Sequence, residues 1–232
     1  MNQQLIWDYF QDEGDESFIR SIGRLRFLVN HGQTLISSSK NKVPTVLNIG
    51  VGNGGLESLC RQKGWNTYSL DPSEVAIKKL EANGGKGKVG IIEKIPYDDN
   101  TFDVVFCSEV LEHLLDEQLQ TGLKEIERVL AKDGYLIGTV PFKENLLANQ
   151  AVCPNCGTRF HKWGHHQSFD IKRLNSILSL NFKVETIEVI YFVSCLSFNL
   201  KGKLVSGVKK LLSIFGEHGS NENIFFTVRK FL

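Results

Sequence analysis

The sequence predicts an α/β fold built on a doubly wound, mostly parallel sheet. From Thr45 onward, short runs rich in β-branched and aromatic residues alternate with segments of helical periodicity, which is typical of a parallel sheet covered on both faces. A glycine-rich turn, NIGVGNGG, joins the first such run to the first helical segment. With 232 residues, 41% of them hydrophobic, the chain is long enough for one large domain with a buried core.

Seven strands and four helices are expected within this domain. The strands are predicted at residues 45–50, 66–70, 88–92, 102–107, 134–140, 182–191 and 223–229. The helices are predicted at residues 54–63, 73–82, 116–130 and 171–180. Ser73 and Asp170 precede two of these helices and are suitable N-cap residues.

Three segments depart from this alternation. Residues 1–42 carry scattered aromatic residues and are expected to form a helical cap beside the main domain, residues 43–232. Residues 141–169 are rich in Cys, Gly and His and are expected to be an insertion. Residues 200–215 alternate lysines with apolar residues, so they could form a basic helix that contacts a membrane surface weakly or packs on the domain.

The overall composition narrows the classes of partner and location. Lys plus Arg (27) nearly balance Asp plus Glu (26), so the chain has no strong charge signal for nucleic acid. No stretch approaches the roughly 20 apolar residues of a membrane span, and the first residues do not resemble a signal peptide. We therefore expect a cytoplasmic protein. Its oligomeric state is not indicated by the sequence.

The glycine-rich turn predicts an adenosine cofactor. Gly50, Gly52 and Gly54 allow the backbone to turn tightly between strand and helix and to approach a ligand. Asp71 ends the next strand, before Pro72, where a carboxylate can accept hydrogen bonds from both ribose hydroxyls. Asp71 could instead serve only as a residue at a helix N-terminus. Because Gly50, Gly52 and Gly55 fit the dinucleotide pattern GxGxxG, a nicotinamide cofactor is an open alternative.

Two later segments carry a more specific resemblance. They are IPYDDNTFDVVFCSEVLEHL, residues 95–114, and LKEIERVLAKDGYLIGTVP, residues 123–141. Here the chain resembles the class I S-adenosylmethionine (SAM) dependent methyltransferases, in which similar turns, strands and an EVLEH segment recur. The resemblance covers residues 45–229 and is specific over residues 45–141. It implies SAM-dependent methyl transfer and a seven-stranded, Rossmann-like sheet whose last strand is antiparallel.

The resemblance also implies a set of cofactor contacts. Gly50, Gly52 and Gly54 would lie under the methionine part of SAM, and Asp71 and Pro72 beside the ribose. Ile91 and Ile92 would lie beside the adenine, Cys107 and Ser108 near the transferred methyl group, and Asn48 near the amino group of SAM. The family usually has Asp or Glu at the position of Asn48, and often an Asp at or near Ile91, so these contacts would be weaker or use the backbone.

The segment SEVLEH suggests a possible metal site. Glu109, Glu112 and His113 are spaced i, i+3 and i+4, so they would share one face of a helix. Metal-dependent methyltransferases that act on the 3′ end of small RNAs look similar here and use such a set with a later His. The segment also occurs in metal-free relatives, where these residues pack under the cofactor loop. Both interpretations stay open.

The insertion predicts a zinc site. In VCPNCGTRFHKWGHHQSFD, a C-x2-C pair is followed at zinc-knuckle spacing by histidines. The expected ligands are Cys153, Cys156, His161 and His165, with His166 as a substitute for His165. Such a staple would stabilise a short loop that has few apolar residues. A redox pair is the alternative, although redox C-x-x-C motifs usually open a helix.

The position of the insertion suggests its role. It follows the fifth strand at its carboxyl end, where open α/β sheets bind their ligands, so we expect it to roof the acceptor pocket. His166, next to a zinc ligand on an extended segment, would point the other way and could act as a general base, as could His165 if the ligands are exchanged. The alternative is a solvated or core histidine. Bacterial relatives with a CPxCGxxFHxWGH-type insertion look similar.

The predicted function is methyl transfer from SAM to a small-molecule or glycan-like acceptor under a zinc-stabilised lid. Three alternatives remain: an RNA 3′-end methyltransferase, a nicotinamide oxidoreductase and a non-catalytic SAM-binding module.

Overall fold

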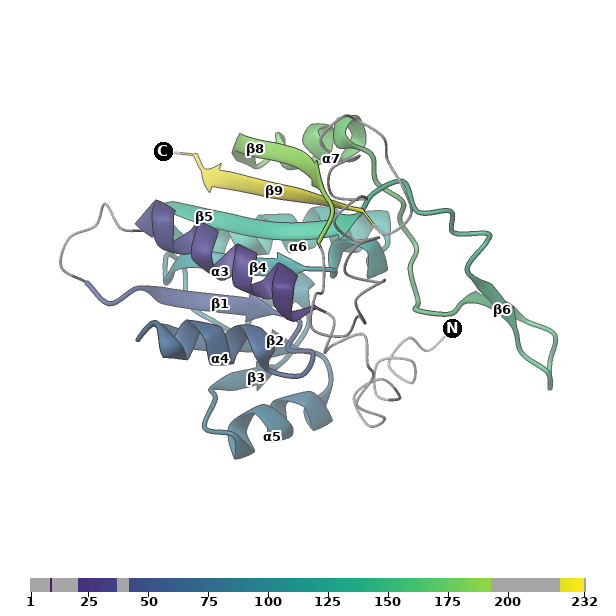
Figure 1. Cartoon of the computed structure of the whole chain (residues 1–232), viewed down its shortest axis with the longest axis horizontal. Coiled ribbons are helices and arrows are strands. Elements are labelled where there is room, and N and C mark those ends of the chain that lie inside the picture. The colour runs from purple at the N-terminus through teal and green to yellow at the C-terminus, as the bar shows by residue number, and fades with distance from the viewer. Residues whose placement is uncertain (1–8, 10–20, 37–41, 193–221, 232) are drawn as a thin grey trace, which may run out of the picture.

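The computed structural model describes Tyr9 and residues 21–36, 42–192 and 222–231. Within this part of the chain, a seven-stranded sheet has the order β3-β2-β1-β4-β5-β9-β8 (Figure 1). Its strands are β1 Thr45–Ile49, β2 Asn66–Asp71, β3 Gly87–Val89, β4 Phe102–Ser108, β5 Leu130–Pro141, β8 Phe182–Ile190 and β9 Asn223–Lys230. β9 is antiparallel to both of its neighbours, and the other pairs are parallel, which confirms the predicted sheet.

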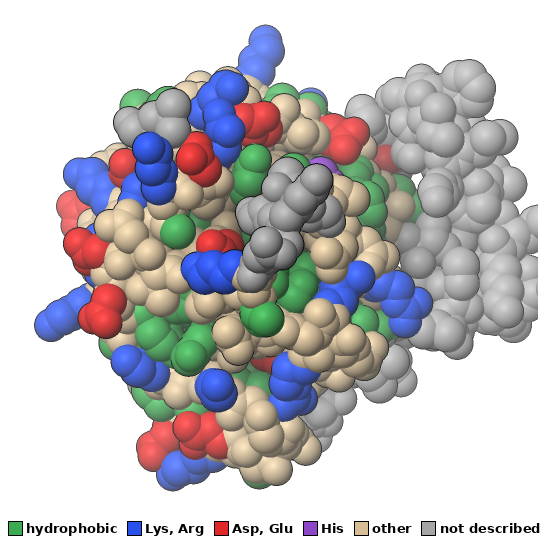
Figure 2. Space-filling model, turned by 90° about the vertical axis from the view of Figure 1, so that its left-hand side faces the viewer, with side chains coloured by type: hydrophobic (Ala, Val, Ile, Leu, Met, Phe, Trp, Pro, Cys, Tyr) green, Lys and Arg blue, Asp and Glu red, His purple; other side chains and the backbone are tan. Residues whose placement is uncertain are grey.

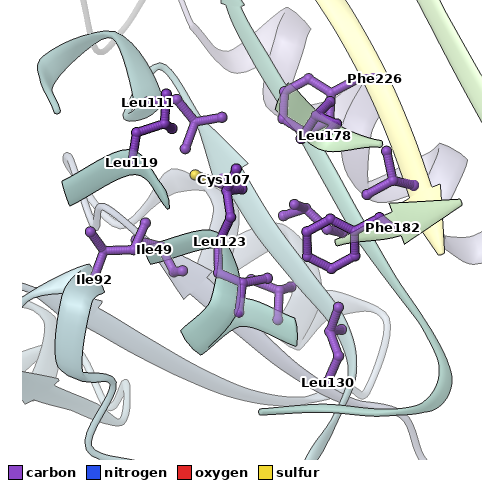
Figure 3. Close-up of a cluster of buried hydrophobic side chains, with 14 of the residues drawn as sticks. Ile49, Ile92, Cys107, Leu111, Leu119, Leu123, Leu130, Leu178, Phe182 and Phe226 are labelled. Atoms are coloured by element: carbon purple, nitrogen blue, oxygen red, sulfur yellow. The ribbon is translucent and has the colours of Figure 1, made fainter. Parts of the chain in front are cut away.

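Helices cover both faces of the sheet. Figure 1 shows α3 (Ile22–Ile36) and α4 (Gly55–Gln62) in front of the sheet and α6 (Asp116–Val129) behind it. Neighbouring residues of each strand point to opposite faces, so Phe106 joins the core under α3 and α4 while Cys107 joins the core under α6. The larger of these two clusters is shown in Figure 3. α7 (Ile171–Leu178) also contributes to it.

Two helices begin at the predicted caps. The hydroxyl of Ser73 accepts a hydrogen bond from the backbone N–H of Ala76 at 3.3 Å, so α5 spans Glu74–Ala82. The carboxylate of Asp170 accepts one from Arg173 at 2.8 Å and caps α7. Both N-cap predictions are confirmed.

The third strand is shorter than predicted. It ends at Val89, and a 3-10 turn, η1 (Ile92–Lys94), begins at a residue that was expected to lie in the strand. Ile92 packs on α6 so closely that a Cβ atom at Gly122 would lie 3.0 Å from its Cγ1. Ile92 is therefore buried, whereas Ile91 is 52% exposed.

Residues 141–169 carry a small separate sheet. β6 (Gln150–Val152) and β7 (Arg159–His161) form an antiparallel hairpin that extends beyond the carboxyl ends of β4 and β5 (Figure 1). An isolated bridge between Phe142 and Phe169 closes the base of this excursion. We call residues 142–169 the lid segment.

Several sequence predictions fall on residues that the structure does not describe. They include the basic segment 200–215 and most aromatic residues of the expected cap. Phe27 of α3 is described and packs edge-on against Phe225, with ring centroids 5.0 Å apart. The division into a cap and a main domain stays a prediction. Among the described helices, none is both long and apolar enough to cross a membrane.

The described surface at the amino ends of the parallel strands carries both positive and negative charges. Figure 2 shows basic and acidic side chains interspersed on this face. The distribution agrees with a net charge of +1 and gives no single-sign patch on this side that would attract nucleic acid.

Candidate functional site

The glycine turn lies at the carboxyl end of β1. Gly50, Gly52 and Gly54 have φ angles of 85°, 54° and 75°, a left-handed conformation that favours glycine. A Cβ atom on Gly50 would lie 2.9 Å from Cγ2 of Val110, in the segment that follows β4. The turn therefore needs glycine at Gly50 for both its conformation and its close packing.

Asp71 orders this turn. One carboxylate oxygen accepts a hydrogen bond from the backbone N–H of Val51 at 2.8 Å, and the other accepts one from Ser73 at 2.8 Å. The side chain is nearly buried at the end of β2, which is next to β1. Asp71 therefore links the end of β2 to the turn that follows β1.

Asn48 is tied into a buried polar cluster beneath the turn. Its side-chain amide donates to the carbonyl oxygen of Gly50 at 2.9 Å and to Oε1 of Glu57 at 2.8 Å. Ser69 donates to the same oxygen at 2.8 Å. Burial raises the pKa of Glu57, and the nearby charge of Asp71 raises it further. The sequence reasoning missed Glu57, although a charge between the apolar residues Leu56 and Cys60 on a short helix is a detectable signal.

The remaining predicted cofactor residues differ in accessibility. The side chain of Cys107 is fully buried in the core, as Figure 3 shows, so Cys107 can meet a ligand only through its backbone. Burial raises the pKa of its thiol. The side chain of Ile92 is also buried, so Ile92 can likewise meet a ligand only through its backbone. Ile91 is exposed, and Ser108 is partly buried at the end of β4.

A polar network surrounds Ser108 where β4 and β5 end. Its hydroxyl lies 2.8 Å from that of Thr139 and accepts a hydrogen bond from Nε of Arg24 at 3.1 Å. Arg24 also lies 3.8 Å from the carboxylate of Glu109, which accepts hydrogen bonds from Asn223 at 3.0 and 2.9 Å. Sequence reasoning missed Arg24, Thr139 and Asn223, because only the folded topology brings α3, β5 and β9 to this place.

The predicted helix face of Glu109, Glu112 and His113 does not form. Glu109 has a left-handed φ of 57°, and the helical turn η2 spans only Leu111–His113. The carboxylate of Glu109 therefore turns toward Arg24 and Asn223, which corrects the prediction of one shared face. Its charge still reaches Glu112, whose pKa is raised first by burial and then by Glu109.

The structure instead groups Glu112 and His113 with the lid segment. The potential ligand atoms of Glu112, His113 and His165 all lie within 4.8 Å of one another. The rings of His113 and His165 meet edge to face, with centroids 4.6 Å apart. Burial and, after it, the neighbouring His165 lower the pKa of His113 to about 3, so the imidazole is neutral at pH 7.

A second group lies beside the first and shares His165. Glu144, His161 and His165 also have ligand atoms within 4.8 Å of one another. The carboxylate of Glu144 lies 2.5 Å from Nδ1 of His165 and 3.4 Å from Nε2 of His161. Burial raises the pKa of Glu144, but the hydrogen bonds from His165 and Asn149 and the charges of His165 and His161 together outweigh it, so the net shift is downward. Glu144 was absent from the sequence predictions.

The four predicted zinc ligands are divided between two places. His161 and His165 stack with ring centroids 4.7 Å apart, whereas Cys153 and Cys156 occupy the hairpin tip. The pairing of Val152 with Arg159 and of Gln150 with His161 puts the cysteines about three residues, roughly 10 Å, along the hairpin from the histidines. Neither metal-compatible group among the described residues contains a cysteine.

The cysteine tip itself has the form of a tight turn. The N–H of Gly157 donates to the carbonyl of Cys153 at 2.9 Å, and Gly157 has a φ of 69°. Sγ of Cys156 lies 3.2 Å from the hydroxyl of Thr158, and this hydrogen bond lowers the pKa of the thiol. The arrangement does not open a helix, unlike the usual redox pair.

Comparisons with known proteins agree with this architecture. Residues 47–138 match the family model described as a methyltransferase domain. An uncharacterized protein of Methanocaldococcus jannaschii is 32% identical over 148 residues, which are 64% of this chain and 59% of that protein. The demethylmenaquinone methyltransferase of Chlorobaculum tepidum is 32% identical over 94 residues, 39% of this chain and 38% of that enzyme. Each alignment thus spans less than two thirds of the relative's length.

Among solved structures, the 1,6-didemethyltoxoflavin-N1-methyltransferase of Burkholderia thailandensis, with bound 1,6-didemethyltoxoflavin and S-adenosylhomocysteine, has a TM-score of 0.66. It is 15% identical, and the match covers 98% of this chain and 87% of that one. The described chain therefore shares the Rossmann-like fold of this methyltransferase, and residues 47–138 match a methyltransferase domain.

Proposed function

We propose that the protein is a SAM-dependent methyltransferase acting on a small-molecule or glycan-like acceptor. The observation that carries this proposal is the left-handed glycine turn of β1 held by Asp71 of β2, within the segment that matches a methyltransferase domain. The antiparallel β9 between β5 and β8 argues against the nicotinamide alternative, since dinucleotide-binding sheets have the parallel order 3-2-1-4-5-6.

The glycine turn fits the proposed cofactor. Because the approach of Val110 excludes a Cβ atom at Gly50, the backbone itself forms the wall of the site. Gly50, Gly52 and Gly54 would receive the methionine part of SAM, with Asn48 supporting the turn from below. Asp71 would accept the ribose hydroxyls beside Pro72. Ile91 would flank the adenine with its side chain, and Ile92, Cys107 and Ser108 complete the proposed set.

The proposed reaction is an in-line displacement. The acceptor atom forms a bond to the methyl carbon while the bond between that carbon and the sulfonium sulfur breaks, so the products are the methylated acceptor and S-adenosylhomocysteine. The protein has to hold the two reacting atoms in line and exclude water. An acceptor hydroxyl also has to lose a proton, and we retain His166 as the proposed general base. This choice is supported by the exposure of His166 beside His165, which is turned into the Glu144 group.

The network of Arg24, Ser108, Glu109 and Asn223 supports a polar acceptor. These side chains lie just beyond β4 and β5, where ligands of open α/β sheets bind. The names of the two methyltransferase relatives both specify small-molecule acceptors. A small-RNA acceptor is supported by the grouping of Glu112, His113 and His165, but the balanced charge of the chain opposes it.

A structural zinc ion in the lid stays part of the proposal. With Cys153, Cys156, His161 and His165 as ligands, zinc binding would require the hairpin tip to fold toward the histidines. His166 remains the substitute ligand, and it would leave His165 with Glu144. Elemental analysis tests the knuckle: one zinc equivalent should be lost in a Cys153→Ser, Cys156→Ser double variant, and unchanged zinc content in that variant would contradict it.

A turnover screen tests the activity. Purified protein and SAM are incubated with fractions of a cell extract, and released S-adenosylhomocysteine is measured. Release that depends on one fraction is the expected result and narrows the acceptor. SAM binding without release from any fraction would favour the non-catalytic module. A cytoplasmic location is likewise a prediction, tested by fractionating cells that produce the protein.

A further inference from the structure

Glu112 is a buried carboxylate whose oxygens have no hydrogen-bond partner among the described residues. Its side chain is fully buried, and neither oxygen accepts a hydrogen bond from any residue that the structure describes. Burying an ionised carboxylate is costly unless it is paired with a cation or coordinates a metal. A protonated Glu112 would not resolve the problem, because its O–H group would still need an acceptor.

Two imidazoles face this carboxylate. The ligand atoms of His113 and His165 lie within 4.8 Å of that of Glu112 and of each other. Ligands of a tetrahedral zinc ion lie about 3.4 Å apart, so small side-chain rotations would close the set around an ion. Glu112 and His113 belong to η2, whereas His165 belongs to the lid segment, 52 positions after His113 in the sequence.

The carboxylate of Glu144 fixes the orientation of the His165 ring. Nδ1 of His165 lies 2.5 Å from the carboxylate of Glu144, which leaves Nε2 for the opposite side of the ring. A carboxylate that accepts the second ring N–H is the usual support of a metal-binding histidine. Glu144 is itself held by Asn149, which donates to its other oxygen at 2.8 Å.

We propose that Glu112, His113 and His165 bind one divalent transition-metal ion, with Glu144 as the residue that positions His165. Two imidazoles and one carboxylate suit zinc and its first-row neighbours, whereas magnesium prefers an all-oxygen set. Three protein ligands leave a coordination position for water or for an atom of the acceptor. Glu109 is outside this set, since its carboxylate bonds to Asn223.

The site would fasten the lid segment to the turn after β4. The backbone N–H groups of His166 and Gln167 already donate to the carbonyl of Glu112, at 2.7 and 3.0 Å. A metal ion held by Glu112 and His165 would add a second link between the same two segments. The proposal concerns metal binding and holds whether or not the protein transfers methyl groups.

The test uses cobalt, whose visible absorption reports its coordination. The full chain is stripped of metal and titrated with Co²⁺, both as the wild type and as the Cys153→Ser, Cys156→Ser variant, which removes any thiolate site. In this variant we expect about one equivalent of Co²⁺, visible absorption of a four- or five-coordinate ion, no thiolate charge-transfer band, and displacement by Zn²⁺.

Single substitutions in the same background locate the ion. Glu112→Gln and His113→Asn should each lower the Co²⁺ affinity at least 100-fold, and Glu144→Gln should lower it about 10- to 100-fold. Glu109→Gln is the matched control and should bind as tightly as its parent. Circular dichroism identifies variants that do not fold. Glu144→Gln, which leaves all three proposed ligands in place, is the second variant if Glu112→Gln fails to fold.

Three results would overturn the proposal. They are unchanged Co²⁺ affinity in folded Glu112→Gln or Glu144→Gln, complete loss of the ion in the cysteine variant, and an equal loss in Glu109→Gln. Binding of Mg²⁺ as tight as that of Co²⁺ would also overturn the assignment of the metal class.

Discussion

The carboxylate of Asp71 accepts a hydrogen bond from the backbone N–H of Val51 at 2.8 Å, which joins the carboxyl end of β2 to the glycine turn that follows β1. The residue proposed to bind the ribose therefore also holds the turn proposed to receive the methionine part. This double role makes Asp71 the most informative position for mutagenesis.

Asp71→Asn should weaken SAM binding strongly. The substitution removes the charged acceptor of Val51, Ser73 and the ribose hydroxyls. One hydrogen bond to a charged group contributes about 1.5–3 kcal/mol, so SAM affinity should fall roughly 10- to 150-fold. Calorimetric titration measures the effect. Asp98→Asn, on an exposed turn, is the matched control and should bind normally. Normal affinity in Asp71→Asn would remove Asp71 from the proposed site.

Gly50→Ala should destabilise the turn. The added Cβ would meet Cγ2 of Val110 at 2.9 Å, and alanine would adopt a φ of 85°, which costs about 1–2 kcal/mol on its own. Denaturant unfolding should show a loss of about 2 kcal/mol or more. Adding Val110→Ala to Gly50→Ala should restore only the part of the lost unfolding free energy that comes from the contact between the new Cβ and Val110. Full restoration would mean that the backbone conformation is not strained.

Glu57 should make stability depend on pH. Burial raises the pKa of Glu57 in the folded protein above its ordinary value of 4.5, so the folded state binds the proton more tightly than the unfolded state. Its contribution to stability is then fully present below pH 4.5 and is lost as the pH rises toward the folded pKa. Glu57→Gln should reduce this loss of stability with rising pH. The urea midpoint of unfolding, measured at several pH values from below 4.5 upward, tests the expectation. An unchanged profile would contradict the raised pKa.

Glu57→Ala tests the same cluster in another way. It leaves the buried amide of Asn48 and the hydroxyl of Ser69 without their shared acceptor, so unfolding free energy should fall by about 1–3 kcal/mol, more than in Glu57→Gln. Equal stability of the two variants would show that these hydrogen bonds contribute little.

His166→Asn tests the proposed general base once the screen has provided an acceptor. Removal of a base should lower kcat by about 100-fold or more while SAM affinity stays normal. Steady-state release of S-adenosylhomocysteine provides the measurement. An unchanged kcat would indicate that His166 is only a solvated histidine.

Much of the fold could be predicted because its signals are local. The glycine turn, the caps at Ser73 and Asp170 and the alternation of strands and helices are each encoded within a few neighbouring residues. The antiparallel last strand followed from the family resemblance. Ile92 deviates because packing on Gly122 of α6 outweighs the β propensity of the run that contains it.

The site was less predictable because its partners are distant in the sequence. Glu109 lies 114 residues from Asn223, and helical spacing gave no sign of the left-handed φ that separates it from Glu112. Glu144 meets His165 across 21 residues of a lid segment whose path depends on the pairing of β6 with β7. Spacing alone suggested one cysteine and histidine site, whereas hairpin register separates the two pairs.

The glycine turn and Asp71 are proposed to bind SAM. Calorimetric titration of the full chain with SAM and, separately, with NAD measures this binding. We expect a binding isotherm of about one SAM per chain, weakened in Asp71→Asn, and no heat of binding with NAD. Tight NAD binding without SAM binding would contradict the account and restore the oxidoreductase alternative.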